Sequence, residues 1–278
     1  MPPIISCLTN SYGRYGPQAA IEMIGSAGLE YIELPIRTAG VESLFKETPL
    51  VTSASTLNDL NQVDRLLDRH HVKVSSCNIG SGNPLEAEVV EITKRKLDLA
   101  SHFGVSLVVA GAGEAETPED LQTLYDHLRQ IGDHAAKKNI TYCFETHPGI
   151  CRNHRKMLET MHALAHPNLR LNFDTANILY YNENIVVEVA LAKVCHLVKH
   201  VHLKDSRGEL GEWYFPALGN GGAVDFVRVY ELMRDCGFNG PYSLEIEGIA
   251  GEDEPTLEQH HQRILDSVEY LRNCGYFD

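Results

Sequence analysis

Short runs of alternating apolar and polar residues recur along the chain, and each is followed by a longer segment with helical periodicity. In the run LRLNFDT, Leu169, Leu171 and Phe173 alternate with Arg170, Asn172 and Asp174, which is typical of a β-strand with one buried face. We predict eight strands of this kind, over residues 3–9, 31–36, 73–79, 106–112, 141–147, 169–175, 198–205 and 242–247.

The segments between the strands predict amphipathic helices, among them residues 16–28, 57–71, 86–104 and 118–139. Apolar residues that share one face of the third helix are Val89, Ile92, Leu99 and Phe103. Thr117 followed by Pro118 is a typical helix start, because threonine caps the first N–H groups and proline suits the first turn.

Eight strand–helix units without a long linker or a low-complexity break predict one parallel sheet with crossover helices. Eight such units close into a (β/α)8 TIM barrel, an α/β fold, and we expect a single domain over residues 1–278. An open doubly wound sheet is the alternative. It is disfavoured because no glycine-rich GxGxxG motif follows the first strand.

The composition limits the partners and the compartment of the protein. The 278 residues are 43% hydrophobic and 22% charged, with a formal net charge of −14. A negative surface disfavours nucleic acid and anionic membranes as partners. The start of the sequence lacks the features of a signal peptide, and no stretch approaches the ~20 apolar residues that span a bilayer. We therefore expect a soluble, cytoplasmic protein and leave homo-oligomerisation open.

The cysteines carry no recognisable pattern of spacing. There are seven, without a CxxC motif. An odd number of scattered cysteines predicts reduced, mostly buried thiols.

Carboxylates and imidazoles stand at the ends of four consecutive predicted strands. They are Glu145 and His147, Asp174, His200 and His202, and Glu245 and Glu247. Chemistry in a TIM barrel lies at the carboxyl ends of the strands, and acidic groups in a barrel mouth are costly without a cation or polar partners. Oxygen ligands with one imidazole suit one divalent ion: Mn2+ or Zn2+ first, with Mg2+ or Co2+ as alternatives.

The motifs CFETHPG, NFDTANI, HVHLKDSRG and YSLEIEG resemble those of the xylose isomerase-like TIM barrel superfamily, in particular its sugar phosphate isomerase/epimerase branch. Endonuclease IV, hydroxypyruvate isomerase, inosose dehydratase and the ketose 3-epimerases are related. The resemblance implies a metal site made by Glu145, Asp174, His202 and Glu245. His202 is favoured over His200 because it directly precedes LKD, and Glu247 remains an alternative to Glu245.

The resemblance also implies an activity. We expect a metal-dependent isomerase or epimerase of a small sugar, keto-sugar or sugar phosphate, which transfers protons through a metal-stabilised enediolate with Glu145 and Glu245 as acid and base. His147 is a candidate substrate contact, and Lys204 and Arg207 are candidates to bind a carboxylate or phosphate. A lyase, such as a dehydratase of an inosose or a dehydroshikimate, is the alternative, and a barrel that binds without turnover is a further one.

An AP endonuclease is less favoured, because the three-zinc cluster of endonuclease IV needs histidines that this chain lacks. Asn177 stands where one would follow the sixth strand, and residues 213–216 offer no ligand where another belongs. The glycine-rich segment ALGNGGAVDF, residues 217–226, is either an anion-binding helix start or a plain helix cap, and the sequence does not choose between them.

Overall fold

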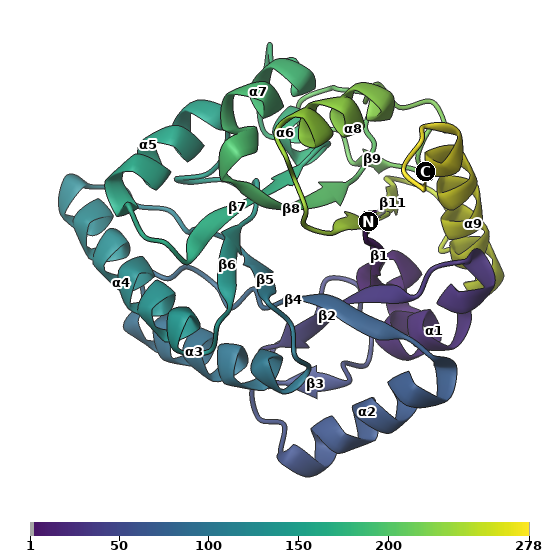
Figure 1. Ribbon diagram of the computed structural model, residues 1–278, viewed down its shortest axis with the longest axis horizontal. Coiled ribbons are helices and arrows are strands. Elements are labelled where there is room, and N and C mark those ends of the chain that lie inside the picture. Colours follow the sequence, from purple (N-terminus) through teal and green to yellow (C-terminus); the bar gives the residue numbers. More distant parts are fainter. Residues whose placement is uncertain (1–2, 278) are drawn as a thin grey trace.

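A closed barrel of parallel strands is the centre of the molecule in a computed structural model that describes residues 3–277 (Figure 1). Within these residues eight strands follow one another around the barrel, and β1 pairs with both β2 and β10 to close it. The TIM-barrel prediction is confirmed. The strands are β1 (Ile5–Leu8), β2 (Tyr31–Arg37), β4 (Lys73–Asn78), β5 (Leu107–Ala110), β6 (Thr141–Phe144), β7 (Leu169–Asp174), β8 (Val198–Leu203) and β10 (Tyr242–Leu244).

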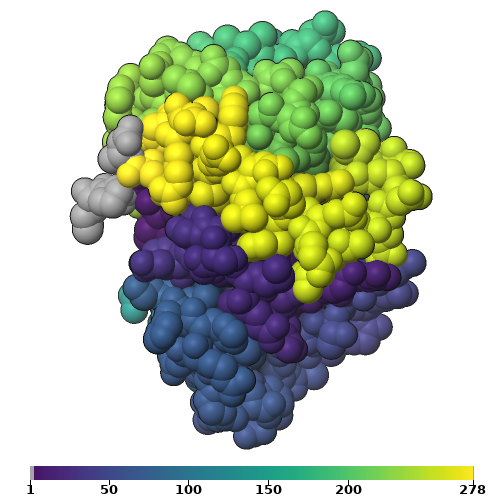
Figure 2. Space-filling model, turned by 90° about the vertical axis from the view of Figure 1, so that its right-hand side faces the viewer, coloured from purple at the N-terminus to yellow at the C-terminus, as the bar shows by residue number. Residues whose placement is uncertain are grey.

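Helices form the outer layer around these strands (Figure 1). They are α1 (Gly16–Met23), α2 (Leu57–His70), α3 (Ala87–His102), α4 (Pro118–Lys137), α5 (His154–Leu164), α7 (Val187–Val194), α8 (Phe226–Asp235) and α9 (Leu257–Asn273). Helix α9 contacts the 3-10 helices η1 (Thr9–Tyr15) and η2 (Ile24–Ala27) on either side of α1. Figure 2 shows this seam, where the C-terminal helix in yellow adjoins the N-terminal segment in purple.

Several short elements lie in the connections between the barrel strands and the outer helices. The two-residue strand β3 (Val51–Thr52) extends the sheet next to the end of β2, and β9 (Tyr214–Phe215) pairs antiparallel with β11 (Gly248–Ile249). The short helix α6 (Asn177–Tyr180) follows β7, and the 3-10 helix η3 (Cys195–Leu197) precedes β8. The elements β3, α6, β9 and β11 belong to the connections after the strands, which carry the functional side chains of a TIM barrel, whereas η3 lies at the opposite, amino end of the strands.

Helix α4 begins as its sequence predicts, whereas the buried face of α3 differs from the prediction. Thr117 accepts a hydrogen bond from the backbone N–H of Asp120 and forms a capping box. In α3 the buried residues are Val90, Thr93, Lys96, Leu97, Leu99 and Ala100. Of the predicted face, Leu99 is buried and Phe103 packs against the core, whereas Val89 and Ile92 are only half-buried and Val90, Thr93 and Lys96 lie in the buried stripe.

Lys96 lies in that stripe because its ammonium has a polar partner. Its side chain is fully buried, and Nζ donates to the carbonyl oxygen of Gly80 over 2.7 Å. Burial, and secondarily the charge of Arg37, lowers the pKa of Lys96 to about 7.

The expectation that all cysteines are reduced is wrong for one pair. Cys195, in η3, and Cys236, directly after α8, form a disulfide across 41 residues of sequence. Packing of α7 against α8 brings these two positions together, which their spacing could not reveal. The remaining five described cysteines are free, and four of them are buried. No helix within residues 3–277 is long and apolar enough to cross a membrane.

Candidate metal centre and active site

Four side chains from four neighbouring strands meet at the carboxyl end of the barrel. Glu145 directly follows β6, Asp174 ends β7, His202 lies near the end of β8, and Glu245 directly follows β10. Strand pairing places Asp174 beside His202, and the backbone N–H of Glu245 donates a hydrogen bond to the backbone carbonyl oxygen of Leu203. Parallel register therefore brings residues that are 100 positions apart to one level of the mouth.

His202 Nδ1 lies at the centre of this group. It is 2.8 Å from Glu245 Oε2, 3.5 Å from Glu145 Oε1 and 3.9 Å from Asp174 Oδ2. One potential ligand atom from each of the four residues lies within 4.8 Å of the others, and all four residues are buried. The arrangement offers three carboxylate oxygens and one imidazole nitrogen, a set that suits a divalent cation.

Two carboxylate oxygens of the group are buried and have no hydrogen bond within the described residues. They are Asp174 Oδ2 and Glu245 Oε2; the latter is close to His202 Nδ1, but the contact lacks hydrogen-bond geometry. In contrast, Asp174 Oδ1 accepts from the backbone N–H groups of Ala176 and Asn177 at 2.8 and 2.7 Å. Buried oxygens without partners are costly, and a cation bound among the four ligand atoms would satisfy both.

The surroundings shift the pKa values of Asp174 and Glu245 in opposite directions. Burial raises the pKa of Asp174 well above its usual value, and the negative charge of Glu245 adds to this despite Lys204. Burial also acts on Glu245, but the charges of Lys204 and His202 outweigh it and hold the pKa of Glu245 well below its usual value. Glu245 is therefore ionised at neutral pH, whereas the charges of Lys204 and His202 do not offset the burial of Asp174.

Lys204 is buried among carboxylates. Its ammonium contacts Glu247 Oε2, lies 3.4 Å from Glu245 Oε1 and stands 4.3 Å above the ring of Phe215. Burial raises the pKa of Glu247 to about 7, with Lys204 acting in the opposite direction. Of the two glutamates after β10, Glu245 lies in the four-residue group and Glu247 is the partner of Lys204.

The other two expected substrate contacts lie in different surroundings. His147 is half-exposed, with Nε2 3.6 Å from Glu145 Oε1 and its ring against Tyr181. Arg207 is exposed, stacks on the ring of Tyr214 at 3.7 Å and pairs with Glu212. The structure thus brings His147 to the four-residue group, whereas Arg207 is occupied by neighbours in its own loop.

The glycine-rich segment before α8 is held by a carboxylate of the protein itself. Asp205 accepts hydrogen bonds from the backbone N–H groups of Gly219 and Val224. Asp225 caps α8 by accepting from the N–H of Arg228. These bonds favour the helix-cap interpretation over an anion site.

Aromatic side chains of the same loops were not predicted as part of the site. Tyr180 contacts the rings of Tyr181, Trp213 and Phe215, with centroids 4.8 to 6.1 Å apart. Trp213 also donates from its indole nitrogen to the backbone oxygen of Glu247. The three consecutive aromatic residues in GEWYF, residues 211–215, were the feature of the sequence that could have predicted this aromatic cluster.

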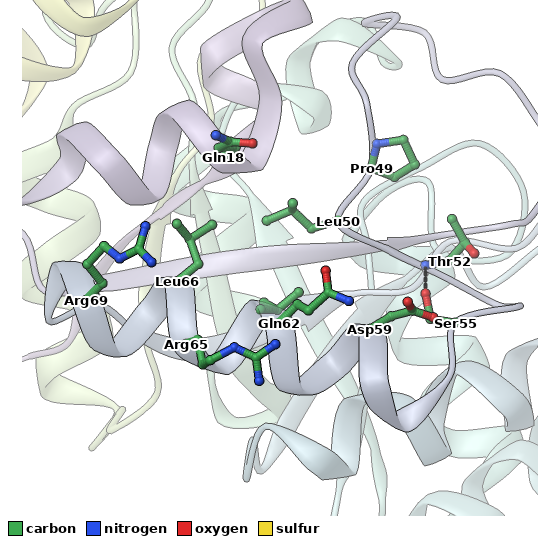
Figure 3. Close-up of a pocket in the computed structure, with 11 residues that line it drawn as sticks. Gln18, Pro49, Leu50, Thr52, Ser55, Asp59, Gln62, Arg65, Leu66 and Arg69 are labelled. Atoms are coloured by element: carbon green, nitrogen blue, oxygen red, sulfur yellow. Dashed lines mark hydrogen bonds between the residues drawn. The ribbon is translucent and has the colours of Figure 1, made fainter.

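A cavity of about 510 Å³ lies elsewhere, between α1, α2 and the segment before β3 (Figure 3). Among the residues that the structure describes, Asp59 is the one carboxylate in its lining, and it accepts hydrogen bonds from Thr56 at the start of α2. No histidine or cysteine lines this cavity within the described residues. Its described lining holds no cluster of carboxylates and imidazoles such as the one at the barrel mouth.

Comparisons with known proteins agree with this architecture. An inosose dehydratase of Geobacillus thermodenitrificans is 24% identical over 227 residues, which cover 70% of this chain and 74% of the relative. An L-ribulose-5-phosphate 3-epimerase of Escherichia coli is 26% identical over 175 residues, 61% of this chain and 60% of the relative. These named relatives are enzymes.

Solved structures share the fold over its full length. A xylose isomerase-like TIM barrel protein from Mycobacterium smegmatis, in complex with magnesium, superposes with a TM-score of 0.72 at 18% identity and covers 99% of this chain and 98% of its own. The family model described as xylose isomerase-like TIM barrel matches residues 21–274. The chain belongs to the xylose isomerase-like TIM barrel family.

Proposed function

We propose that the protein is a divalent-metal-dependent isomerase or epimerase of a small sugar, keto-sugar or sugar phosphate. The observation that carries this proposal is the convergence of Glu145, Asp174, His202 and Glu245, whose ligand atoms lie within 4.8 Å of one another. These four residues would hold the cation. When bound, it would acidify a C–H group next to a carbonyl by stabilising negative charge on the substrate oxygens.

Glu145 and Glu245 are the proposed proton-transfer groups. They follow β6 and β10, which are separated by β7 and β8 around the barrel, so a substrate at the mouth would lie between them. Glu245 is ionised at neutral pH because Lys204 and His202 lower its pKa, and it can therefore accept a proton. In an epimerase, the glutamate on one face removes the proton and the glutamate on the other face returns one.

Other side chains would bind and orient the substrate. His147 is half-exposed beside Glu145, and we propose that it contacts a hydroxyl group. Lys204 would contact an oxygen of the substrate while it holds Glu247 and Glu245 in place. We leave Arg207 out of the proposed contacts, since it is stacked on Tyr214 and paired with Glu212.

A dehydratase of an inosose or related acid is the second candidate, and the relation to an inosose dehydratase favours it. The same residues would serve in the first step, because elimination next to a carbonyl also begins with removal of a proton from carbon. The two reactions differ in the second step. Reprotonation of the carbon gives an epimer or isomer, whereas loss of a hydroxyl group as water gives a carbon–carbon double bond.

Solvent exchange tests this proposal. The protein loaded with Mn2+ is incubated in D2O with ketoses, inososes and ketose phosphates, and deuterium incorporation and product identity are followed by NMR. Glu145→Gln and Glu245→Gln should each lower turnover by about 10²–10⁴-fold, and Glu159→Gln on the outer helix α5 is the matched control. Turnover near the wild-type rate in either site variant, with metal bound, would refute the two-carboxylate mechanism.

A further inference from the structure

A buried carboxylate lies behind the four-residue group, on the opposite side of the His202 ring. Glu33, in the middle of β2, is fully buried, and its two oxygens lie 3.0 and 3.2 Å from His202 Nε2. Strand β2 contributes no residue to the four-residue group. Glu33 is thus 169 residues away from His202 in sequence and touches it from across the barrel.

A histidine binds a metal ion as the neutral ring, and the contacts of His202 favour one tautomer of that form. A carboxylate accepts hydrogen bonds, so His202 Nε2 carries the hydrogen that points to Glu33. On the other side, the amide nitrogen of Asn172 lies 3.1 Å from His202 Nδ1 and donates to it, which requires a lone pair on Nδ1. In the neutral ring both contacts therefore place the hydrogen on Nε2 and the lone pair on Nδ1, which faces Glu145, Asp174 and Glu245. A cation in the four-residue group would take this lone pair in place of the Asn172 N–H.

The surroundings hold this arrangement in place. His200, two residues earlier on β8, lies between Ser76 Oγ at 3.0 Å and Asn172 Oδ1 at 2.9 Å. Ser76, Asn172, His200 and His202 are all fully buried. His200 is accordingly occupied inside the barrel, and its bond to Asn172 orients the amide that faces His202.

We propose that Glu33 is a positioning residue, which fixes His202 with Nδ1 as the metal-binding nitrogen and strengthens that ligand through a charged hydrogen bond. This inference rests on the proposed metal site. Carboxylates or carbonyls behind metal-bound histidines fix the ring and raise its basicity, and their loss typically lowers metal affinity by about 10–100-fold. Glu33 acts through His202 and is not expected to touch the substrate.

Mn2+ titration followed by EPR of the free ion tests the effect on affinity. Glu33→Gln keeps the shape of the side chain and removes its charge, so the Kd for Mn2+ should rise about 10–100-fold while the stoichiometry at saturation stays near one. Glu47→Gln is the matched control, because Glu47 is also buried but pairs with Arg37. Glu47→Gln should leave the Kd for Mn2+ within about twofold of the wild-type value, because within the described residues Glu47 makes no contact with His202.

The wild-type protein supplies a second readout that needs no variant. In the Zn2+-loaded protein, long-range 1H–15N spectra should show His202 with a protonated Nε2 in a strong hydrogen bond and Nδ1 without hydrogen. Equal Mn2+ affinity of the wild type and Glu33→Gln would overturn the role of Glu33 while the metal site stands. A protonated Nδ1 with a bare Nε2 would also overturn it and would remove His202 from the four-residue site, since Nδ1 is the atom that faces the three carboxylates. If the wild type binds no Mn2+ or Zn2+, the proposed metal site falls as well.

Discussion

Replacement of Lys204 by methionine should destabilise the protein strongly, because it leaves buried carboxylates without their cation. The side chains of Lys204, Glu245 and Glu247 are only 3%, 5% and 11% exposed, so solvent screens their interaction little. Methionine keeps much of the length and volume of lysine. The change therefore removes mainly the charge that faces Glu247 and Glu245.

The expected cost follows from the burial of this cluster. Loss of one partner from a buried ion pair costs about 3–5 kcal/mol. In proteins of this size about 1 kcal/mol corresponds to ~2–4 °C in Tm. The cost should be larger at pH 8 than at pH 6, since the pKa of Glu247 is about 7 and its protonation removes one of the charges that Lys204 neutralises.

Urea unfolding in the presence of EDTA measures this effect. The double variant Lys204→Met, Glu247→Gln should recover part of the loss, because the unpaired carboxylate is also removed. Lys156→Met is the control at an exposed pair with Glu159 and should cost at most about 1 kcal/mol. A loss below about 1 kcal/mol for Lys204→Met, or strict additivity in the double variant, would refute the buried cluster as described.

Two further predictions concern the packing around the barrel. The pKa of Lys96 is lowered to about 7 in the folded protein, so above that pH the unfolded chain binds more protons than the folded one. The contribution of Lys96 to the free energy of unfolding therefore rises with pH above about 7. Lys96→Met should lose this rise between pH 7 and pH 9 in urea titrations, and an unchanged pH dependence of the free energy of unfolding would contradict the lowered pKa. Gly222→Ala should lower Tm, because a Cβ atom there would collide with the carboxylate of Asp205. Gly25→Ala is the control, because a Cβ atom at that position meets open space. Equal Tm values for both variants would show that the loop around Asp205 is not tightly packed.

The sequence was sufficient to predict the barrel and the rim of the site because both depend on local pattern and chain order. Each of the eight predicted strands overlaps an observed one. Asp174 and Glu245 could be placed at the mouth because the carboxyl ends of parallel strands meet at one edge. The alternation of apolar and polar residues identifies each strand, and the common direction of the strands identifies their carboxyl ends. Neither step requires knowledge of which strands are neighbours.

The features that escaped prediction depend on contacts between distant segments. Glu33 is visible in the sequence as a charge within the apolar run YIELPI, but its partner lies 169 residues further on. The Cys195–Cys236 disulfide joins η3 to the end of α8, and neither spacing nor motif relates the two cysteines. The buried face of α3 was predicted only in part, because the burial of Lys96 depends on an acceptor in the loop after β4.

The binding of one divalent cation by Glu145, Asp174, His202 and Glu245 is the central claim, and metal stoichiometry tests it most directly. The protein is stripped with EDTA, reloaded with Mn2+, passed through a desalting column and analysed for metal and protein. The wild type and Asp68→Ala, a change on the exposed surface of α2, should each retain about one Mn2+ per chain, as a single four-ligand site implies. Asp174→Ala should retain far less while its circular dichroism spectrum stays that of the folded barrel; a wild-type protein without metal, or an Asp174→Ala variant that binds as much as the wild type, would contradict the claim.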